Sequence, residues 1–317
     1  MTGGEVARFA ADLAALSAPG ERIGLAVSGG PDSLALLLLA AAARPGMIAA
    51  ATVDHRLRPE ARAEAEQVAA ICGDRAVPHA ILSARWTNLP TANLQARARD
   101  ERYALLADWG DAEGLAAIAT AHHADDQAET LLMRLARGSG IAGLGGVRPS
   151  RPMGERVALI RPLLKWRKSE LAEVVATAGL AALDDPANRD PRHDRARTRQ
   201  WLADNPGLDP LRLAASAAWL READDALEWI TASLREARLT RTADAVTLDP
   251  SDIPPELRRR LLLAAFSDFG AAPPSGPDLS RALAALRLGD TVTLAGIKLV
   301  GGERWRLTLA PPRTRRG

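Results

Sequence analysis

Short apolar runs alternate with helical patterns through the first half of the chain, and this alternation constrains the fold more than any other feature. Strands are predicted at 23–28, 47–53, 76–83 and 115–120, and helices at 32–43, 59–72, 91–109 and 125–136. Strands that are joined through helices need right-handed crossovers, which give a parallel sheet with helices on both faces. The sequence therefore predicts an α/β, Rossmann-like fold that binds its ligands at the carboxyl ends of the strands.

The pattern changes near residue 205, which predicts two domains, 1–205 and 206–317. The second region reads as mainly helical, with one long helix over 211–238 and a last helix after the Pro-rich stretch 271–278. The segment 290–310 alternates apolar and polar residues around a Gly-Gly pair, which indicates a short terminal β-hairpin. We therefore expect a catalytic α/β domain followed by a smaller, mainly helical one.

Composition excludes several classes of protein. The net charge is only +2, so no general affinity for polyanions is expected, although nearly all the basic residues are Arg. Cys72 is the only cysteine, which excludes a disulfide framework or a Cys-ligated cluster within one chain. No signal peptide is apparent, and the longest apolar run, 34–43, is too short for a membrane span. The sequence predicts a cytoplasmic protein with no membrane partner.

The turn 28–33, Ser-Gly-Gly-Pro-Asp-Ser, joins the first predicted strand to the following helix. Its glycines allow the backbone to approach a ligand closely, and the N–H groups of a helix start favour an anion. An ordinary strand-to-helix turn has a similar composition, so the spacing alone leaves a plain connection open. It is not a Walker A loop, because no Gly-Lys-Ser/Thr follows; Asp32 stands in the loop, where a carboxylate suits a magnesium ion among phosphates.

A second polar cluster, 120–130, joins the fourth predicted strand to the next helix. Asp126 and Glu129 are three residues apart and therefore share a helix face. Acidic residues also favour a first helical turn for electrostatic reasons, but this does not account for the adjacent His122 and His123. The His-Glu-x-x-His pattern of zinc proteases is absent, so a catalytic zinc is not expected.

Three other segments carry weaker signals. Asp54 follows the second predicted strand, where a turn residue is common. Arg99 and Arg102 lie beside Tyr103 on a predicted helix that could equally present a solvated charged face. The segment 189–199 holds five Arg and two Asp and could meet RNA phosphates.

Taken in chain order, these segments resemble the bacterial tRNA(Ile)-lysidine synthetases, which belong to the PP-loop ATP pyrophosphatase superfamily. The matching segments are 28–33, 53–58, 98–103, 122–130, 134–144, 160–164 and 184–188, followed by Arg195 and Arg199. The resemblance covers roughly residues 20–205, and its most discriminating part is His-His-Ala-Asp-Asp-Gln-Ala-Glu-Thr at 122–130. Two departures are visible: Ala196 follows Arg195 where the family usually has Asn, and residues 206–317 are short for the family's C-terminal region.

The resemblance implies a PP-loop, adenine nucleotide alpha hydrolase-like domain and an ATP-dependent ligase. The implied reaction adds free L-lysine to carbon 2 of the wobble cytidine in isoleucine tRNA with a CAU anticodon, through an adenylated cytidine. The lysidine product changes the codon read from AUG to AUA. ATP and Mg²⁺ are implied as reactant and cofactor, and a homodimer is left open.

The resemblance also implies a role for particular residues. Those implied at the ATP site are Ser28, Gly29, Gly30, Pro31, Asp32, Ser33, Val53 and Asp54. Those implied in catalysis are Asp32, which would also hold magnesium, His123 and Arg99. Those implied at the lysine site are Asp126, Glu129 and Arg195, and those implied at RNA or ATP phosphates are Arg102 and Arg199.

Two alternatives remain open from the sequence. The first is another PP-loop enzyme, but tRNA thiolases of this superfamily use pairs of cysteines, and the amide-forming members usually carry a glutaminase domain or another ammonia route. The second is an RNA-binding module without catalysis, which would gain nothing from Asp32, Asp126 and Glu129 facing phosphates. ATP–pyrophosphate exchange, with and without the tRNA, discriminates between a ligase and a binding module.

Overall fold

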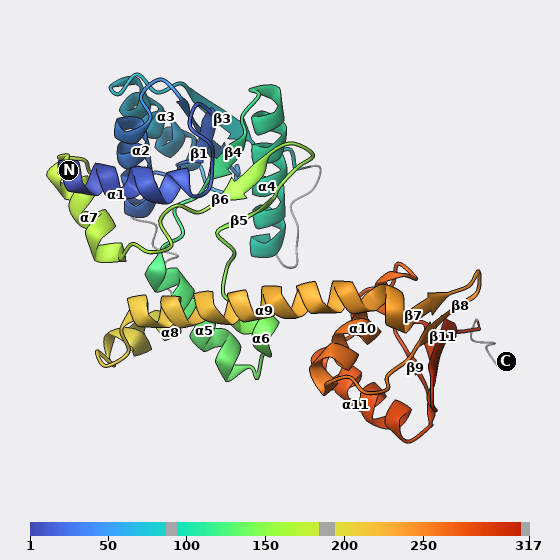
Figure 1. Cartoon of the computed structure of the whole chain (residues 1–317). Coiled ribbons are helices and arrows are strands. Elements are labelled where there is room, and N and C mark those ends of the chain that lie inside the picture. The colour runs from blue at the N-terminus through green and yellow to red at the C-terminus, as the bar shows by residue number, and fades with distance from the viewer. Residues whose placement is uncertain (87–93, 184–193, 312–317) are drawn as a thin grey trace. The chain divides into compact units, whose positions relative to one another are not determined.

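The structure is a computed structural model that describes residues 1–86, 94–183 and 194–311 (Figure 1). The chain forms two compact units, residues 1–221 and 222–317, and the division falls within the long helix α9 (Pro210–Arg238). The boundary that we expect near residue 205 precedes this helix. Helix α9 itself corresponds to the helix predicted over 211–238.

The first unit contains a six-stranded sheet with the order β3-β2-β1-β4-β6-β5. Its strands are β1 (Ile23–Ala26), β2 (Ile48–Asp54), β3 (His79–Ser83), β4 (Ala117–Ala119), β5 (Ser150–Pro152) and β6 (Ala158–Ile160). All neighbouring strands are parallel except β5, which pairs antiparallel with β6. The predicted parallel α/β sheet is confirmed, with β5 and β6 as additional strands at one edge.

Helices cover both faces of this sheet. The helices of this unit are α1 (Gly3–Ala14), α2 (Pro31–Ala43), α3 (Ala61–Gly73), α4 (Leu94–Ala112), α5 (Ala124–Ala136), α6 (Ile141–Leu144), α7 (Lys168–Thr177) and α8 (Asp194–Ala203). Helices α2 and α3 pack on one face of the sheet and α4 packs on the other, while α1 and α7 pack against α2. Helix α5 packs against α6 and α8 rather than against the sheet (Figure 1). The predicted helix over 91–109 corresponds to α4, and its first residues, 91–93, lie outside the described residues.

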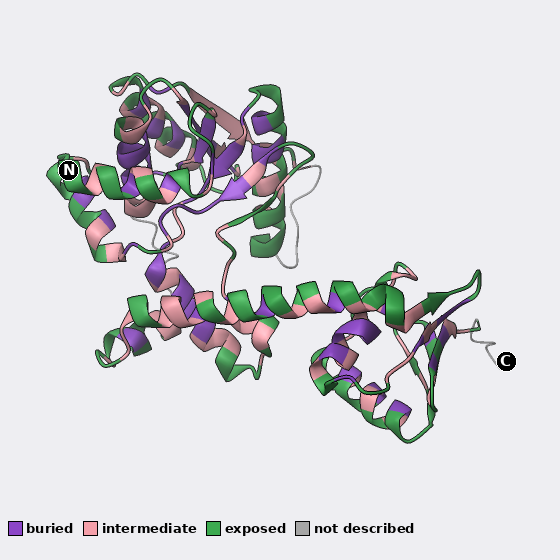
Figure 2. Ribbon diagram, in the orientation of Figure 1, coloured by how far each residue is buried: buried purple, intermediate pink, exposed green. Residues whose placement is uncertain are grey.

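The two faces have separate hydrophobic cores because successive residues of a strand point to opposite faces. In β2, Ile48 and Ala50 pack with α2 and α7 in one core, whereas Ala49 and Ala51 pack with Trp109 of α4 in the other. Helix α2 is buried from Ser33 to Ala40, as the burial colours of Figure 2 show for the centre of the unit. This rigid centre holds the loop at the N-terminus of α2 in place.

The second unit has a five-stranded antiparallel sheet with the order β7-β8-β11-β10-β9. Its elements are β7 (Leu239–Arg241), β8 (Ala245–Leu248), α10 (Pro255–Ser267), α11 (Gly276–Arg287), β9 (Thr291–Leu294), β10 (Ile297–Val300) and β11 (Trp305–Leu309). The expected terminal hairpin is therefore part of a larger sheet, whose core includes Phe266 and Trp305. Within the described ranges, no helix combines the length and the apolar character needed to cross a membrane.

Candidate active site

A cleft of about 1090 Å³ opens in the first unit at the carboxyl ends of β1, β2 and β4. The loop after β1 contributes Ser28 and residues 30–33, and the segment after β4 contributes His122 and His123. Helices α4 and α8 complete the cleft with the side chains of Arg99, Arg102, Tyr103, Arg195 and Arg199. The cleft thus lies where a parallel sheet of this kind binds its ligands.

The loop between β1 and α2 is held by its own hydrogen bonds. The hydroxyl of Ser33 donates to the carbonyl of Gly30 at 2.9 Å and accepts from the backbone N–H of Ser28 at 3.1 Å. Gly29 adopts a φ of +84°, and a Cβ atom there would lie 2.4 Å from Cδ1 of Leu183. No side chain caps the N-terminus of α2, so its first N–H groups are available to an anion.

Asp32 lies in the first turn of α2 and has one unsatisfied oxygen. Its Oδ2 lies 3.5 Å from Nε2 of His123, whereas its Oδ1 is buried with no hydrogen-bond partner among the described residues. A carboxylate oxygen without a partner, next to open N–H donors, fits a magnesium ion bound together with phosphates. No group of three or more His, Cys, Asp or Glu that could hold a metal occurs in the described part of the chain, so phosphate oxygens and water would supply the other ligands.

His123 begins helix α5 and connects three carboxylates. Its Nδ1 accepts from the backbone N–H of Asp126 at 3.4 Å, while its own backbone N–H donates to Oδ2 of Asp126 at 3.1 Å. Burial opposes protonation of the ring, but the hydrogen bond with Asp32 and the charges of Asp126, Asp32 and Asp125 outweigh it, so the pKa of His123 is raised. This ring can therefore hold a proton near neutral pH.

His122 has the opposite electrostatic environment. Its Nδ1 lies 2.9 Å from the hydroxyl of Thr120. Burial, followed by the charges of Arg161, Arg99 and Arg195, lowers the pKa of His122 to about 4, against the opposing charge of Asp126. The ring is thus neutral at pH 7, which separates the roles that the two adjacent histidines can take.

Ion pairs connect helix α5 to helix α8. Glu129, whose side chain is 1% exposed, accepts from Nε of Arg195 at 2.6 Å and from Nε of Arg199 at 2.7 Å. Arg195 also donates to Oδ1 of Asp126 at 2.7 Å. Burial alone would lower the pKa of Arg195, but these two carboxylates raise it. Two carboxylates of α5 and two guanidiniums of α8 therefore neutralise each other where the two helices meet.

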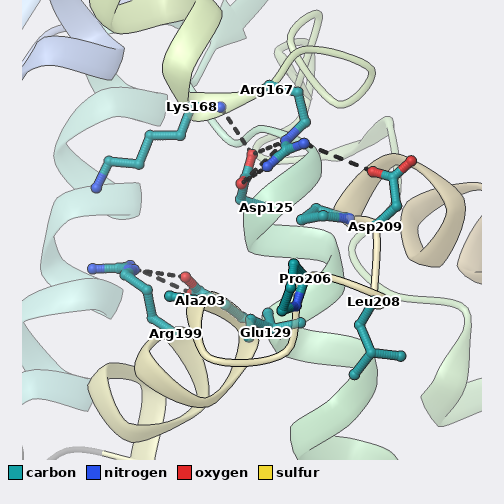
Figure 3. Close-up of a pocket in the computed structure, with 11 residues that line it drawn as sticks. Asp125, Glu129, Arg167, Lys168, Arg199, Ala203, Pro206, Leu208 and Asp209 are labelled. Carbon is teal, nitrogen blue, oxygen red and sulfur yellow. Dashed lines mark hydrogen bonds and ion pairs between the residues drawn. The ribbon is translucent and has the colours of Figure 1, made fainter.

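A smaller cavity of about 420 Å³ lies next to these ion pairs (Figure 3). Asp125 lines it and accepts from the guanidinium of Arg167, with distances of 3.2 to 3.3 Å, and from the backbone N–H of Lys168 at 2.8 Å. Figure 3 also shows Arg167 reaching Asp209 and Arg199 reaching Glu129. This cavity presents both acidic and basic groups to a small ligand.

The structure brings most of the predicted site residues to these two cavities. The cleft is lined by Ser28, Gly30, Pro31, Asp32, Ser33, Val53, Arg99, Arg102, His123, Asp126, Arg195 and Arg199, whereas Glu129 and Arg199 line the smaller cavity. Gly29 does not line the cleft, and neither does Asp54, whose Oδ1 accepts from the backbone N–H of Arg56 at 2.8 Å. Asp54 thus stabilises the turn after β2.

His55 lines the cleft and was not expected as a site residue. Both of its ring nitrogens are buried and have no partner among the described residues, and its carbonyl accepts from the indole N–H of Trp86 at 2.6 Å. Burial, and then the charge of Arg102, lowers the pKa of His55. Its place after the second strand was visible in the sequence, but a lone histidine in a turn is a weak signal.

The loop geometry and the sheet place the protein in the PP-loop class. Residues 5–205 match the family described as "PP-loop domain". The fold is similar to that of the U34-tRNA thiolase NcsA from Methanococcus maripaludis, with a TM-score of 0.56 and 18% identity over 71% of this chain and 79% of that one. At this level of identity the likeness concerns the fold alone.

Two relatives that match nearly the whole chain identify the family within the PP-loop class. The chain is 48% identical to a tRNA(Ile)-lysidine synthase of Novosphingobium aromaticivorans, over 97% of this chain and 94% of that protein. It is 44% identical to a tRNA(Ile)-lysidine synthase of Zymomonas mobilis, over 92% of this chain and 89% of that protein. The chain belongs to the tRNA(Ile)-lysidine synthase family.

Proposed function

We propose that the protein is an ATP-dependent ligase that converts the wobble cytidine of isoleucine tRNA with a CAU anticodon into lysidine. The observation that carries this proposal is that Asp32, one of whose carboxylate oxygens has no partner among the residues described, faces the same cleft as Asp126. A loop suited to phosphates and a carboxylate suited to an amine thus line one cleft. Full-length relatives named as tRNA(Ile)-lysidine synthases support the same reaction.

The first step would activate the cytidine. Its O2 atom attacks the α-phosphorus of ATP, and the bond from this phosphorus to the bridging oxygen of pyrophosphate breaks. The N–H groups at the start of α2 would bind the phosphates, with Ser28 and Gly30 at the wall of the cleft. Val53, near the carboxyl end of β2, would border the nucleoside, and Asp54, which does not line the cleft, would act by holding the turn after β2.

A magnesium ion bound to Asp32 would offset the negative charge that the phosphates accumulate. Asp32 would in turn be oriented by His123, which lies 3.5 Å away. Arg99 would contact the reacting phosphate from helix α4, and Arg102 and Arg199 would contact phosphates of ATP or RNA.

The second step would join lysine to the activated ring. The ε-amino nitrogen of lysine attacks carbon 2, the bond from carbon 2 to O2 breaks, and AMP leaves with that oxygen. The nitrogen gives up a proton, which His123 could accept in its neutral form. AMP is a far better leaving group than a ring carbonyl oxygen, and for this reason the first step is needed.

Lysine would bind through Asp126, Glu129 and Arg195, beside the smaller cavity. In the structure Arg195 already pairs with both Asp126 and Glu129. The carboxylate of lysine would draw Arg195 away from Asp126, and an ammonium group of lysine would take its place on the acid. An exchange of ion pairs conserves the number of charge contacts in the pocket.

The alternatives account for fewer of these features. A thiolase mechanism with paired cysteines has no basis, because Cys72 is the only cysteine and its thiol is buried, which raises its pKa to about 11. A module that only binds RNA would not need carboxylates in the wall of an anion-binding cleft. The position of the boundary near residue 205, with an RNA-binding role for residues 206–317, remains part of the proposal.

Mass spectrometry of the wobble nucleoside tests the function directly. The protein is incubated with ATP, lysine and an unmodified transcript of the CAU-anticodon isoleucine tRNA, and we expect lysidine only when all three are present. The methionine tRNA with the same anticodon is the matched control. Unchanged cytidine in the complete reaction, with ATP–pyrophosphate exchange also absent, would overturn the proposal and favour the binding module.

A further inference from the structure

Three arginines surround Tyr103, which lines the cleft together with one of them, Arg99. The guanidinium carbon of Arg99 lies 5.0 Å from the centre of the Tyr103 ring, and that of Arg151 lies 4.9 Å from it. Arg161 interacts with the phenol of the same residue. Arg99 comes from α4, Arg151 from the edge strand β5, and Arg161 directly follows β6.

This cluster lacks the carboxylates that balance the other arginines of the site. Arg195 and Arg199 pair with acidic residues of α5, but within the described residues no carboxylate pairs with Arg99, Arg151 or Arg161. Among the residues that the structure describes, these three guanidiniums around one phenol have no paired carboxylate and therefore form a positive spot.

Arg161 is the most unusual member of the cluster. It is only 4% exposed, it donates to the carbonyl of Arg148, and its Nε is buried with no hydrogen-bond partner among the described residues. Burial lowers the pKa of Arg161, as expected for a cation held away from water. A buried guanidinium that pairs with no carboxylate of the described segments is costly unless an anion completes its environment.

The position of the cluster indicates which anion this is. In the sheet, β4 separates β6 from β1, whose loop forms the phosphate cradle. Two strand spacings place the end of β6 roughly 10 Å from that cradle. The nucleoside of ATP, bordered by Val53 near the end of β2, would lie on the opposite side of β1. The side of the sheet at β6 is therefore available to the RNA strand that carries the cytidine.

We propose that Arg151 and Arg161 bind a backbone phosphate of the RNA strand next to the nucleotide that is modified, beside Arg99, which lines the cleft. Guanidinium groups suit this ligand because they offer paired donors in a planar arrangement. Tyr103 keeps the arginines in position through contacts with each of them. The inference rests on the proposed function for its choice of RNA, and it adds a phosphate site whose members Arg151 and Arg161 had no role before.

The test compares Arg151→Ala with Arg156→Ala, since both residues are exposed and belong to the β5–β6 hairpin. Binding of a labelled anticodon stem-loop is measured by fluorescence anisotropy over a series of salt concentrations, without ATP or lysine. We expect Arg151→Ala to weaken RNA binding roughly tenfold and to reduce the slope of log affinity against log salt by about 0.7. Arg156→Ala should change neither quantity.

A second variant, Arg161→Gln, tests the buried member and is checked for folding by circular dichroism. ATP affinity is measured for every variant. If the arginines bound the triphosphate instead of RNA, the substitutions would lower ATP affinity and leave RNA binding intact. That result would overturn the inference, as would an unchanged salt slope for a folded Arg151→Ala protein.

The two proposals fail separately. Should the wild-type protein form no lysidine while Arg151→Ala still changes the salt slope, the reaction is wrong and the phosphate site stands. Should lysidine form while the slope is unchanged, the phosphate site alone is wrong.

Discussion

Oδ2 of Asp32 and Nε2 of His123 lie 3.5 Å apart, although the two residues follow different strands of the sheet. The contact joins the phosphate-binding loop after β1 to the start of α5 after β4. Oδ1 of Asp32 has no hydrogen-bond partner in the part of the chain that the structure describes, and His123, which contacts Oδ2, also lies next to Asp125 and Asp126. The protonation of His123, before α5, therefore affects the carboxylate of Asp32 in the loop after β1.

Asp32→Asn should abolish pyrophosphate release without unfolding the protein. The amide keeps the shape of the side chain but loses the charge that would hold magnesium. ATP–pyrophosphate exchange with the tRNA present measures the first effect, and thermal unfolding measures the second. Exchange at the normal rate in this variant would refute the role of Asp32.

His123→Gln should lower stability more at low pH than at high pH. The raised pKa of His123 means that its protonated form is favoured in the folded state. This contribution is fully present below the unfolded pKa of about 6.5 and is lost as the pH rises through the higher folded value. We expect a residual loss of about 1 kcal/mol at pH 9 from the missing helix cap, and a larger loss at pH 6, both measured by urea unfolding. An equal loss at both pH values would contradict the raised pKa.

His122→Asn should have the opposite pH dependence. Because burial lowers the pKa of His122 to about 4, the unfolded chain takes up a proton between pH 6.5 and pH 4 that the folded chain does not. The wild-type protein should therefore lose about 2 kcal/mol between pH 7.5 and pH 5 that the variant keeps. The difference between the two unfolding free energies, measured at both pH values, checks this expectation.

Gly29→Ala and Gly30→Ala form a matched pair in the phosphate-binding loop. Gly29 has a φ of +84° and its new Cβ would meet Leu183, so alanine there should cost at least about 1–2 kcal/mol. The nearest atom to a Cβ on Gly30 is Oγ of Ser28, 3.8 Å away, so alanine there should leave stability nearly unchanged. Because Gly30 lines the cleft, its methyl group should still weaken ATP binding several-fold. Thermal unfolding and ATP titration separate the two effects.

Glu129→Gln should loosen helix α8 and weaken lysine binding more than ATP binding. The carboxylate is buried and pairs with two arginines, but both guanidiniums are partly exposed, so we expect a loss of about 1–2 kcal/mol rather than the full cost of breaking a buried pair. Hydrogen exchange of residues 194–203 measures the first effect, and the lysine and ATP dependence of the reaction measures the second. A variant whose ATP requirement alone rises would place lysine elsewhere.

The sequence predicted the centre of the fold well because its signals are local. Apolar runs of strand length, broken by Gly, Pro and Asp, located β1 to β4 and the helices that follow them. The Gly, Pro and Asp residues that follow these runs also located the loop at Ser28 and the start of α5, since functional loops of a parallel sheet gather at one edge.

The edge of the sheet was not predictable in this way. Strands β5 and β6 are each three residues long, and β5 is exposed throughout, so neither produces a periodic pattern. The role proposed for Arg161 depends on its burial and on the absence of a paired carboxylate within residues 1–86, 94–183 and 194–311, and these are properties of tertiary packing. The pairing of Arg195 with both Asp126 and Glu129 likewise depends on how α8 packs against α5.

The short strand β5 ends at Pro152, whose ring nitrogen carries no hydrogen to offer to another strand. The charged residue Arg151 precedes it in the same edge strand. Edge strands that contain proline and charged residues disfavour pairing with a strand of another molecule, and many proteins avoid aggregation in this way. Replacing Pro152 would thus endanger solubility at high concentration before it disturbed the chemistry of the cleft.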